Sequence, residues 1–299
     1  MKNFAMLAVV GLAASAAVAQ NTGARLTDGS AIFDYTASGT GTLPTSSTAG
    51  GNVTMNLQID GLANAIGTRQ LFSGNWYYRI SGDTRERHFA NAATRTLTGT
   101  NSVTWTFGSM FGSGGIAVGG LTSSMSYTVT DTGADSVLLA SSVTVNNAGN
   151  TAVVIDLFNA YDVDLAATFP GDVYAALLTS GGNRQWNFSD AAAGGPWTGA
   201  FLGIGAQGAG VGGFSAINGQ MTDTGVDNFI PDLNAGGVAA ADNAAVMQWR
   251  LTIPAGGSFS VDSFLAIGRN GAEAVVPTPG AAALLGLGGL VALRRRRTA

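Results

Sequence analysis

The chain has 299 residues, of which 46% are hydrophobic and only 11% charged, with 44 glycines and no cysteine. This composition supports a folded core in one domain or two, and it excludes disulfides, thiol catalysis and cysteine-ligated metals. Five of the fourteen basic residues lie at the two ends, so the body holds 9 arginines against 18 acids, a net charge of −9 that argues against nucleic-acid binding.

The first predicted element is a secretory signal peptide over residues 1–19. Lys2 supplies a positive start, residues 4–16 form a short apolar helix, and Ala17 and Ala19 occupy the small-residue positions of an A-x-A cleavage site. A helix buried in the fold is the alternative interpretation. A cleaved signal predicts an exported protein.

Residues 20–272 form the predicted folded domain. Hydrophobic and polar residues alternate in "NSVTWTF" (101–107), "SMSYTVT" (124–130) and "MQWRLTI" (247–253), while a helical period is almost absent. Alternation of this length is typical of strands with one buried face. Together with the lack of a fixed internal repeat, it predicts an all-β, antiparallel β-sandwich of jelly-roll-like type.

Three turn sequences predict three hairpins. In the first, "SGDT" joins residues 76–80 to 85–89 and places Arg79 opposite Glu86 and Tyr77 opposite His88. The other two pair residues 141–145 with 151–158, and 249–253 with 258–265. The glycine- and alanine-rich stretch 191–245 predicts a short helix or loop excursion.

The first predicted hairpin carries a candidate ligand-binding site. Trp76, Tyr77 and Arg79 combine aromatic rings with a guanidinium group, which suits sugar rings if Tyr77 and Arg79 are exposed. The alternative is that Trp76 packs in the core. His88 with Asp83 and Glu86 offers an acid/base group, or equally a solvated charged face.

Asp162 and Asp164 are the candidate metal ligands. They share one face if the strand through them continues, and hard carboxylate oxygens suit Ca²⁺. An EF-hand pattern is missing, so an ordinary acidic loop is the alternative. A histidine/cysteine zinc site cannot be built from one histidine. No cofactor beyond a structural calcium is expected.

No set of residues marks a catalytic site. The only glutamates are Glu86 and Glu273, and Glu273 adjoins the C-terminal tail, so a glycosidase pair is not evident. The sequence therefore predicts a protein that is not an enzyme. A polysaccharide-active enzyme built on paired aspartates is kept as an alternative.

The last element, residues 273–299, predicts a membrane segment. No charge occurs from residue 274 to 293, and Pro279 suits the first position of a helix over residues 280–293. That helix would be roughly 21 Å long against a hydrocarbon core of about 30 Å, so it is short for a span. The arginines after it would stay in the cytoplasm.

The order of two prolines, a short apolar helix and a terminal arginine cluster resembles the C-terminal sorting signal of PEP-CTERM proteins of Gram-negative bacteria. Thr278 stands where the family has Glu. The signal comprises Pro277, Thr278, Pro279, Arg294, Arg295, Arg296 and Arg297, and all of these except Thr278 match the family pattern. The resemblance implies recognition by an exosortase, passage through the inner membrane, and delivery to the cell surface or beyond. An ordinary C-terminal membrane anchor is the alternative.

We therefore expect an exported, surface-directed β-sandwich with a PEP-CTERM-like signal and a structural or extracellular-matrix role. A carbohydrate-binding module or a polysaccharide-active enzyme at the cell surface is the alternative. The expected partners are an exosortase-type enzyme, the membrane through the C-terminal helix, and polysaccharide, but not nucleic acid.

Overall fold

The structure is a computed structural model that describes residues 24–37, 53–59, 71, 73–83, 86–89, 94–112, 115–133, 136–163, 165, 173–178, 184–190, 197–204, 214–218 and 243–269. These residues form sixteen β-strands in three sheets, and every strand pairing within the sheets is antiparallel. No α-helix occurs within the described ranges. The prediction of an all-β, antiparallel sandwich-like fold is confirmed.

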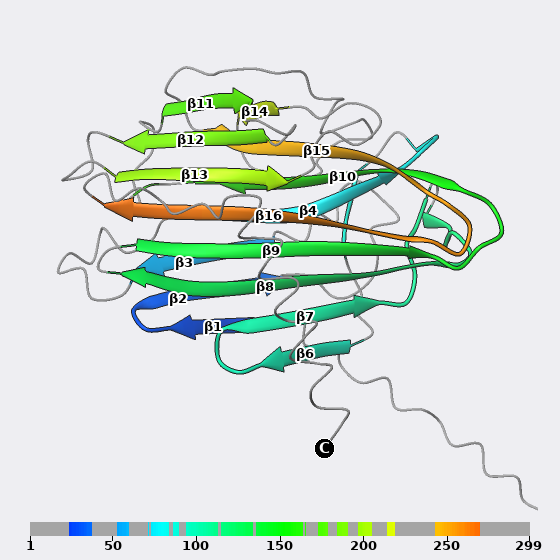
Figure 1. The fold of residues 1–299 in the computed structure, drawn as a ribbon, viewed down its shortest axis with the longest axis horizontal. Coiled ribbons are helices and arrows are strands. Elements are labelled where there is room, and N and C mark those ends of the chain that lie inside the picture. Colours follow the sequence, from blue (N-terminus) through cyan, green and yellow to red (C-terminus); the bar gives the residue numbers. More distant parts are fainter. Residues whose placement is uncertain are drawn as a thin grey trace, which may run out of the picture.

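An eight-stranded sheet forms the front layer of Figure 1. Its order is β11 (Val173–Leu178), β12 (Arg184–Asp190), β13 (Trp197–Ile204), β16 (Ser258–Arg269), β9 (Ser136–Asn147), β8 (Leu121–Gly133), β7 (Ser102–Phe107) and β6 (Thr94–Thr98).

Two smaller sheets lie behind it (Figure 1). The five-stranded sheet has the order β14 (Phe214–Asn218), β15 (Asn243–Ile253), β10 (Val153–Asp162), β4 (Ser73–Ile80) and β5 (Arg87–His88). The three-stranded sheet has the order β1 (Ala24–Asp28), β2 (Ala31–Ala37) and β3 (Val53–Ile59).

The alternation seen in the sequence sets which face of each strand is buried. Along β8 and β9 nearly every second residue is buried, and on β7 Val103, Trp105 and Phe107 are buried as predicted. Successive side chains point to opposite faces of a strand, so this pattern turns one face of the large sheet toward the smaller sheets. The outward residues are polar over β6–β8, whereas Leu138, Ala140 and Phe264 also lie on the outward face farther along the sheet.

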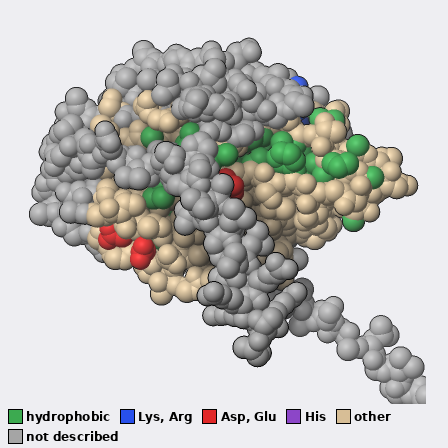
Figure 2. Space-filling view, viewed as in Figure 1, with side chains coloured by type: hydrophobic (Ala, Val, Ile, Leu, Met, Phe, Trp, Pro, Cys, Tyr) green, Lys and Arg blue, Asp and Glu red, His purple; other side chains and the backbone are tan. Residues whose placement is uncertain are grey.

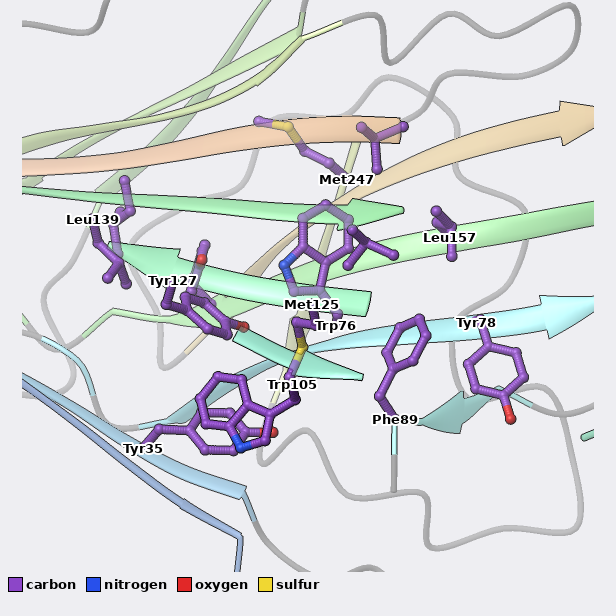
Figure 3. Packing of buried hydrophobic residues seen from close by; sticks show 14 of the residues in the cluster. Tyr35, Trp76, Tyr78, Phe89, Trp105, Met125, Tyr127, Leu139, Leu157 and Met247 are labelled. Atoms are coloured by element: carbon purple, nitrogen blue, oxygen red, sulfur yellow. The ribbon is translucent and has the colours of Figure 1, made fainter. Parts of the chain in front are cut away.

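A single aromatic-rich core joins the three sheets (Figure 3). Phe33 of β2 packs on Tyr127 of β8 with ring centroids 5.2 Å apart, and Tyr161 of β10 packs on Phe201 of β13 at 4.8 Å. Trp249 of β15 also donates its indole N–H to the carbonyl of Ile204 in the facing layer, at 2.9 Å. These contacts make the layers one packed unit.

Of the three predicted hairpins, the first is confirmed and the other two are wrong. Tyr77 pairs with His88, as the "SGDT" turn predicts. In contrast, β9 and β10 belong to different sheets, as do β15 and β16. The turns at 148–152 and 254–257 therefore act as arches that carry the chain from one layer to the other.

Asn147 holds the two arches together. Its side-chain amide lies 2.8 Å from the carbonyl of Thr151 in one arch and 3.2 Å from that of Pro254 in the other. Its backbone N–H donates to the carbonyl of Gly257, at 2.8 Å. In the second arch Gly256 adopts φ +69°, which a glycine tolerates at little cost.

Other details of the prediction differ or fall outside the described residues. A jelly roll has eight strands in two Greek keys, whereas one sheet here already contains eight strands, most of them joined to their chain neighbours. Stretch 191–245 contributes β13 and β14 rather than only a helix or loop. The predicted helices in 1–19 and 273–299 lie outside the described residues. Within the described ranges, no helix has the length and apolar character needed to cross a bilayer.

Candidate functional site

Strand β4 buries all three residues that were predicted to bind a sugar. Trp76 faces the core, packs on Trp249 with centroids 5.1 Å apart, and donates to Ser141 Oγ at 3.1 Å. Tyr77 and Arg79 point to the other face of the sheet, and each is only 7% exposed. The exposed ring and guanidinium on which the sugar-binding hypothesis depended are not present at these residues.

Arg79 instead forms the centre of a buried ion-pair cluster. Its guanidinium donates to Glu86 Oε1 at 3.1 Å and to Asp156 Oδ2 at 3.3 Å, and it lies 5.3 Å from the ring centroid of Phe158. The pairing with Glu86 is the one that the hairpin register predicts. Asp156 was not predicted, because it is brought in from β10 by long-range strand pairing.

The carboxylate of Asp156 is fully engaged. Besides Arg79, it accepts from Gln248 at 3.1 Å and from two nitrogens of Arg250 at 2.8 and 3.0 Å. Two arginines thus balance the two carboxylates, and no oxygen of Asp156 is left to accept a proton from a substrate. The Asp156 carboxylate is therefore not a free general base.

The carboxylates near His88 are likewise used by arginines. Asp83 Oδ2 lies 3.2 Å from a guanidinium nitrogen of Arg87, and Glu86 binds Arg79. The backbone of His88 pairs with Tyr77, and its side chain lies outside the described ones. The described side chains therefore do not bring together the acid/base group considered above.

The described side chains do not test the prediction of a calcium site. Asp162 ends β10 and pairs with Ser73 and Ala244, but its side chain lies outside the described part, as does all of Asp164. The described residues contain no cluster of three or more potential ligands. The sorting-signal residues Pro277–Pro279 and Arg294–Arg297 and the cleavage residues Ala17 and Ala19 also lie outside it.

The structure does assemble one surface that the sequence did not reveal as a site, which we call the hydroxyl face. It is the outward face of the eight-stranded sheet over β6, β7 and β8, where every outward residue up to residue 130 is serine or threonine. These residues are Thr94, Thr96, Thr98, Ser102, Thr104, Thr106, Thr122, Ser124, Ser126, Thr128 and Thr130.

Strand register arranges these hydroxyls in rows across the sheet. One row runs from Thr94 through Thr106 and Ser124 to Thr144 and Ser260 on the neighbouring strands β9 and β16. Hydroxyls in adjacent strands are hydrogen bonded within rows, for example Thr144 to Ser260 at 2.7 Å. Adjacent strands lie about 4.8 Å apart, so the hydroxyls within a row repeat at that spacing.

The hydroxyl face is uncharged over β6–β8. Figure 2 shows this side of the molecule, where the lower part of the described surface is mainly tan, the colour of uncharged polar side chains and of backbone, with acidic groups at its left edge. Asp262 on β16 is the acidic residue that borders the rows, since it pairs with Ser142. Each hydroxyl both donates and accepts hydrogen bonds, so the face can bind neutral polar partners without the desolvation cost of a charge.

Comparisons with known proteins assign no family. No family model matches the chain, and no curated protein matches it. Solved structures that it resembles include a putative aldose 1-epimerase from Escherichia coli K12, with 10% identity over 83% of this chain and 99% of that one and a TM-score of 0.43.

Two further structures show a similar degree of likeness. A galactose mutarotase-like protein from Lactobacillus casei ATCC 334 has 8% identity over 82% of this chain and 99% of that one, with a TM-score of 0.42. A putative kojibiose phosphorylase from the human microbiome has 9% identity over 81% of this chain but only 26% of that one, with a TM-score of 0.35.

The expectation that the protein is not an enzyme is corrected by this comparison. Structures that it resembles are named as a putative aldose 1-epimerase and a galactose mutarotase-like protein, so that expectation is withdrawn. At these identities and TM-scores the likeness transfers no active site and no substrate to this chain.

Proposed function

We propose that this protein is exported, directed to the cell surface by its PEP-CTERM-like signal, and binds neutral polysaccharide there through the hydroxyl face. The proposal extends the carbohydrate-binding alternative but moves the site from Tyr77 and Arg79 to the opposite layer. The observation that carries it is the uninterrupted set of outward serines and threonines on β6, β7 and β8.

Hydrogen-bond chemistry favours a neutral glycan as the partner. A polysaccharide presents hydroxyls that donate and accept, as the side chains of this face do. An anionic polymer gains nothing here, because the face offers no basic group over β6–β8 and the body of the chain has a net charge of −9. A broad sheet surface suits an extended chain or fibre rather than a short sugar held in a pocket.

Binding is tested by removing hydroxyls without changing side-chain shape. In the double variant Thr104→Val/Thr128→Val, we expect binding to insoluble neutral polysaccharides to weaken by about tenfold, from the loss of roughly 0.5–1.5 kcal/mol per hydrogen bond. Co-sedimentation with cellulose, chitin and an α-glucan measures this. The matched control is Thr252→Val, an exposed threonine on the other layer, which should bind as the wild type does.

Equal binding by the double variant and the wild type contradicts the hydroxyl face as the site. Absence of binding to every neutral polysaccharide in the panel contradicts the proposal as a whole.

Delivery is tested by the intact mass of the protein in each cell fraction. We expect surface or released protein to begin after Ala19, and to end near Thr278 if an exosortase processes it. Protein recovered in the cytosol with Lys2 and Arg297 still present contradicts export. A surface form that retains the arginines indicates an ordinary membrane anchor instead of a processed signal.

A further inference from the structure

Within the part of the chain that the structure describes, the core contains buried polar atoms for which no hydrogen-bond partner is found. Four of them are Asn75 Nδ2, Trp105 Nε1, Tyr127 OH and Asn159 Oδ1. Each of these residues is at most 1% exposed. A buried polar atom without a hydrogen-bond partner is destabilising, because it has lost its bonds to bulk water, so four of them in one core require an explanation.

Direct contacts connect three of these residues on one side of the core. The ring of Tyr127 lies 6.1 Å from that of Trp105 and 5.8 Å from that of Tyr35. Tyr35 in turn donates its hydroxyl to Asn75 Oδ1, at 3.4 Å. Tyr35 and Trp105 also contact each other, with ring centroids 4.8 Å apart, and Figure 3 shows them together below Tyr127.

The fourth residue joins the same group through Ser141. Ser141 is the cross-strand partner of Tyr127, and its Oγ lies 3.5 Å from Asn159 Nδ2. The same Oγ lies 2.7 Å from Ser263 Oγ and 3.4 Å from Tyr161 OH. These residues from both layers form one group, which we call the inner polar patch: Tyr35, Asn75, Trp76, Trp105, Tyr127, Ser141, Asn159, Tyr161 and Ser263.

The inner polar patch is neutral. Its members are amides, hydroxyls and indoles, and burial raises the pKa of the Tyr161 hydroxyl to about 12 and that of Tyr127 well above its usual value. The unmatched atoms include donors, an acceptor and a hydroxyl that can do both. A ligand for them must be neutral, must donate and accept, and must be small enough for an enclosed core.

Water is the molecule with these properties, and we propose that the inner polar patch is a binding site for ordered internal water. Water bound there supplies an acceptor to Asn75 Nδ2 and Trp105 Nε1 and a donor to Asn159 Oδ1. Buried waters commonly make about three hydrogen bonds to otherwise unmatched groups. The site links the two layers at a place where apolar packing alone leaves these atoms without partners.

The wild-type protein provides the first test. Oxygen-17 magnetic relaxation dispersion of the folded protein should detect long-lived internal water, and a high-resolution crystal structure should place it within hydrogen-bond distance of Tyr127 OH or Asn159 Oδ1. A folded protein that shows no long-lived water, and no density at the patch, overturns the proposal.

A pair of variants tests the assignment to the patch. Tyr127→Phe should lose at least one long-lived water and lower the urea midpoint, because it removes a group to which water is bound. Tyr78→Phe is the matched control: its hydroxyl accepts from the backbone N–H of Phe111 outside the patch, so its water count should stay unchanged. An increased midpoint in Tyr127→Phe with an unchanged water count shows instead that the hydroxyl was unsatisfied, and it rejects the proposal.

Discussion

At single residues, the alternation of hydrophobic and polar side chains predicts which face of a strand a residue occupies, but not whether that face is buried. Alternation correctly separates Trp76 from Tyr77 and Arg79, because side chains along a strand alternate between faces. It does not tell whether the second face of a strand is open to solvent, and here Phe158 and Gln248 on that face are fully buried. Alternation carries no information about what covers the second face, so the loss of the expected sugar site could not be predicted from the local sequence.

The ion-pair cluster leads to a prediction about stability. Asp156→Asn removes the carboxylate shared by Arg79 and Arg250, and it should cost about 3–5 kcal/mol because two guanidinium groups are left with one carboxylate, that of Glu86, in a largely buried cluster. The free energy of unfolding in urea measures the loss.

A surface pair provides the control for that variant. Arg25 and Asp34 lie 3.7 Å apart with side chains 62% and 27% exposed, so Asp34→Asn should cost about 0–1 kcal/mol. If the two variants lose equal stability, the Asp156 cluster contributes no more than an ordinary surface pair.

At the scale of elements, the same short turn can produce a hairpin or an arch. "SGDT" closes a hairpin, whereas the turns at 148–152 and 254–257 send the chain to the other layer. Loop length and turn residues are compatible with a hairpin and with an arch. The apolar face of a strand does not determine which neighbouring strand it pairs with. The strands were therefore predictable, but two of the three proposed pairings were not.

Asn147 bonds to both arches and leads to a second prediction about stability. Asn147→Ala removes an amide that serves carbonyl groups of both arches, and it should lower the free energy of unfolding by about 1–3 kcal/mol. Thermal and urea unfolding measure this. Its exposed neighbour allows a matched control, since Asn146→Ala should change stability by less than about 0.5 kcal/mol. A similar loss in both variants means that the amide does not hold the arches.

At the scale of the whole molecule, the hydroxyl face depends on the register between strands that are distant in the sequence. The sequence shows that Ser102, Thr104 and Thr106 share a face of one strand, but not that they align with residues of β6 and β8. Only the pairing of strands gathers isolated serines and threonines into a surface. The class of fold could thus be predicted from alternation, whereas the candidate site required the order of the strands.

The order of the sheets also determines when the fold can be completed. The last described strand, β16, inserts between β9 and β13, and β15 inserts between β10 and β14. Until residues 243–269 are available to pair, the eight-stranded sheet and the five-stranded sheet are each divided into two parts with unpaired edges. If the chain crosses a membrane from its N-terminus, as proposed, its layers cannot close until nearly all of it has been translocated. Incomplete sheets would thus keep the chain from folding fully before export is finished.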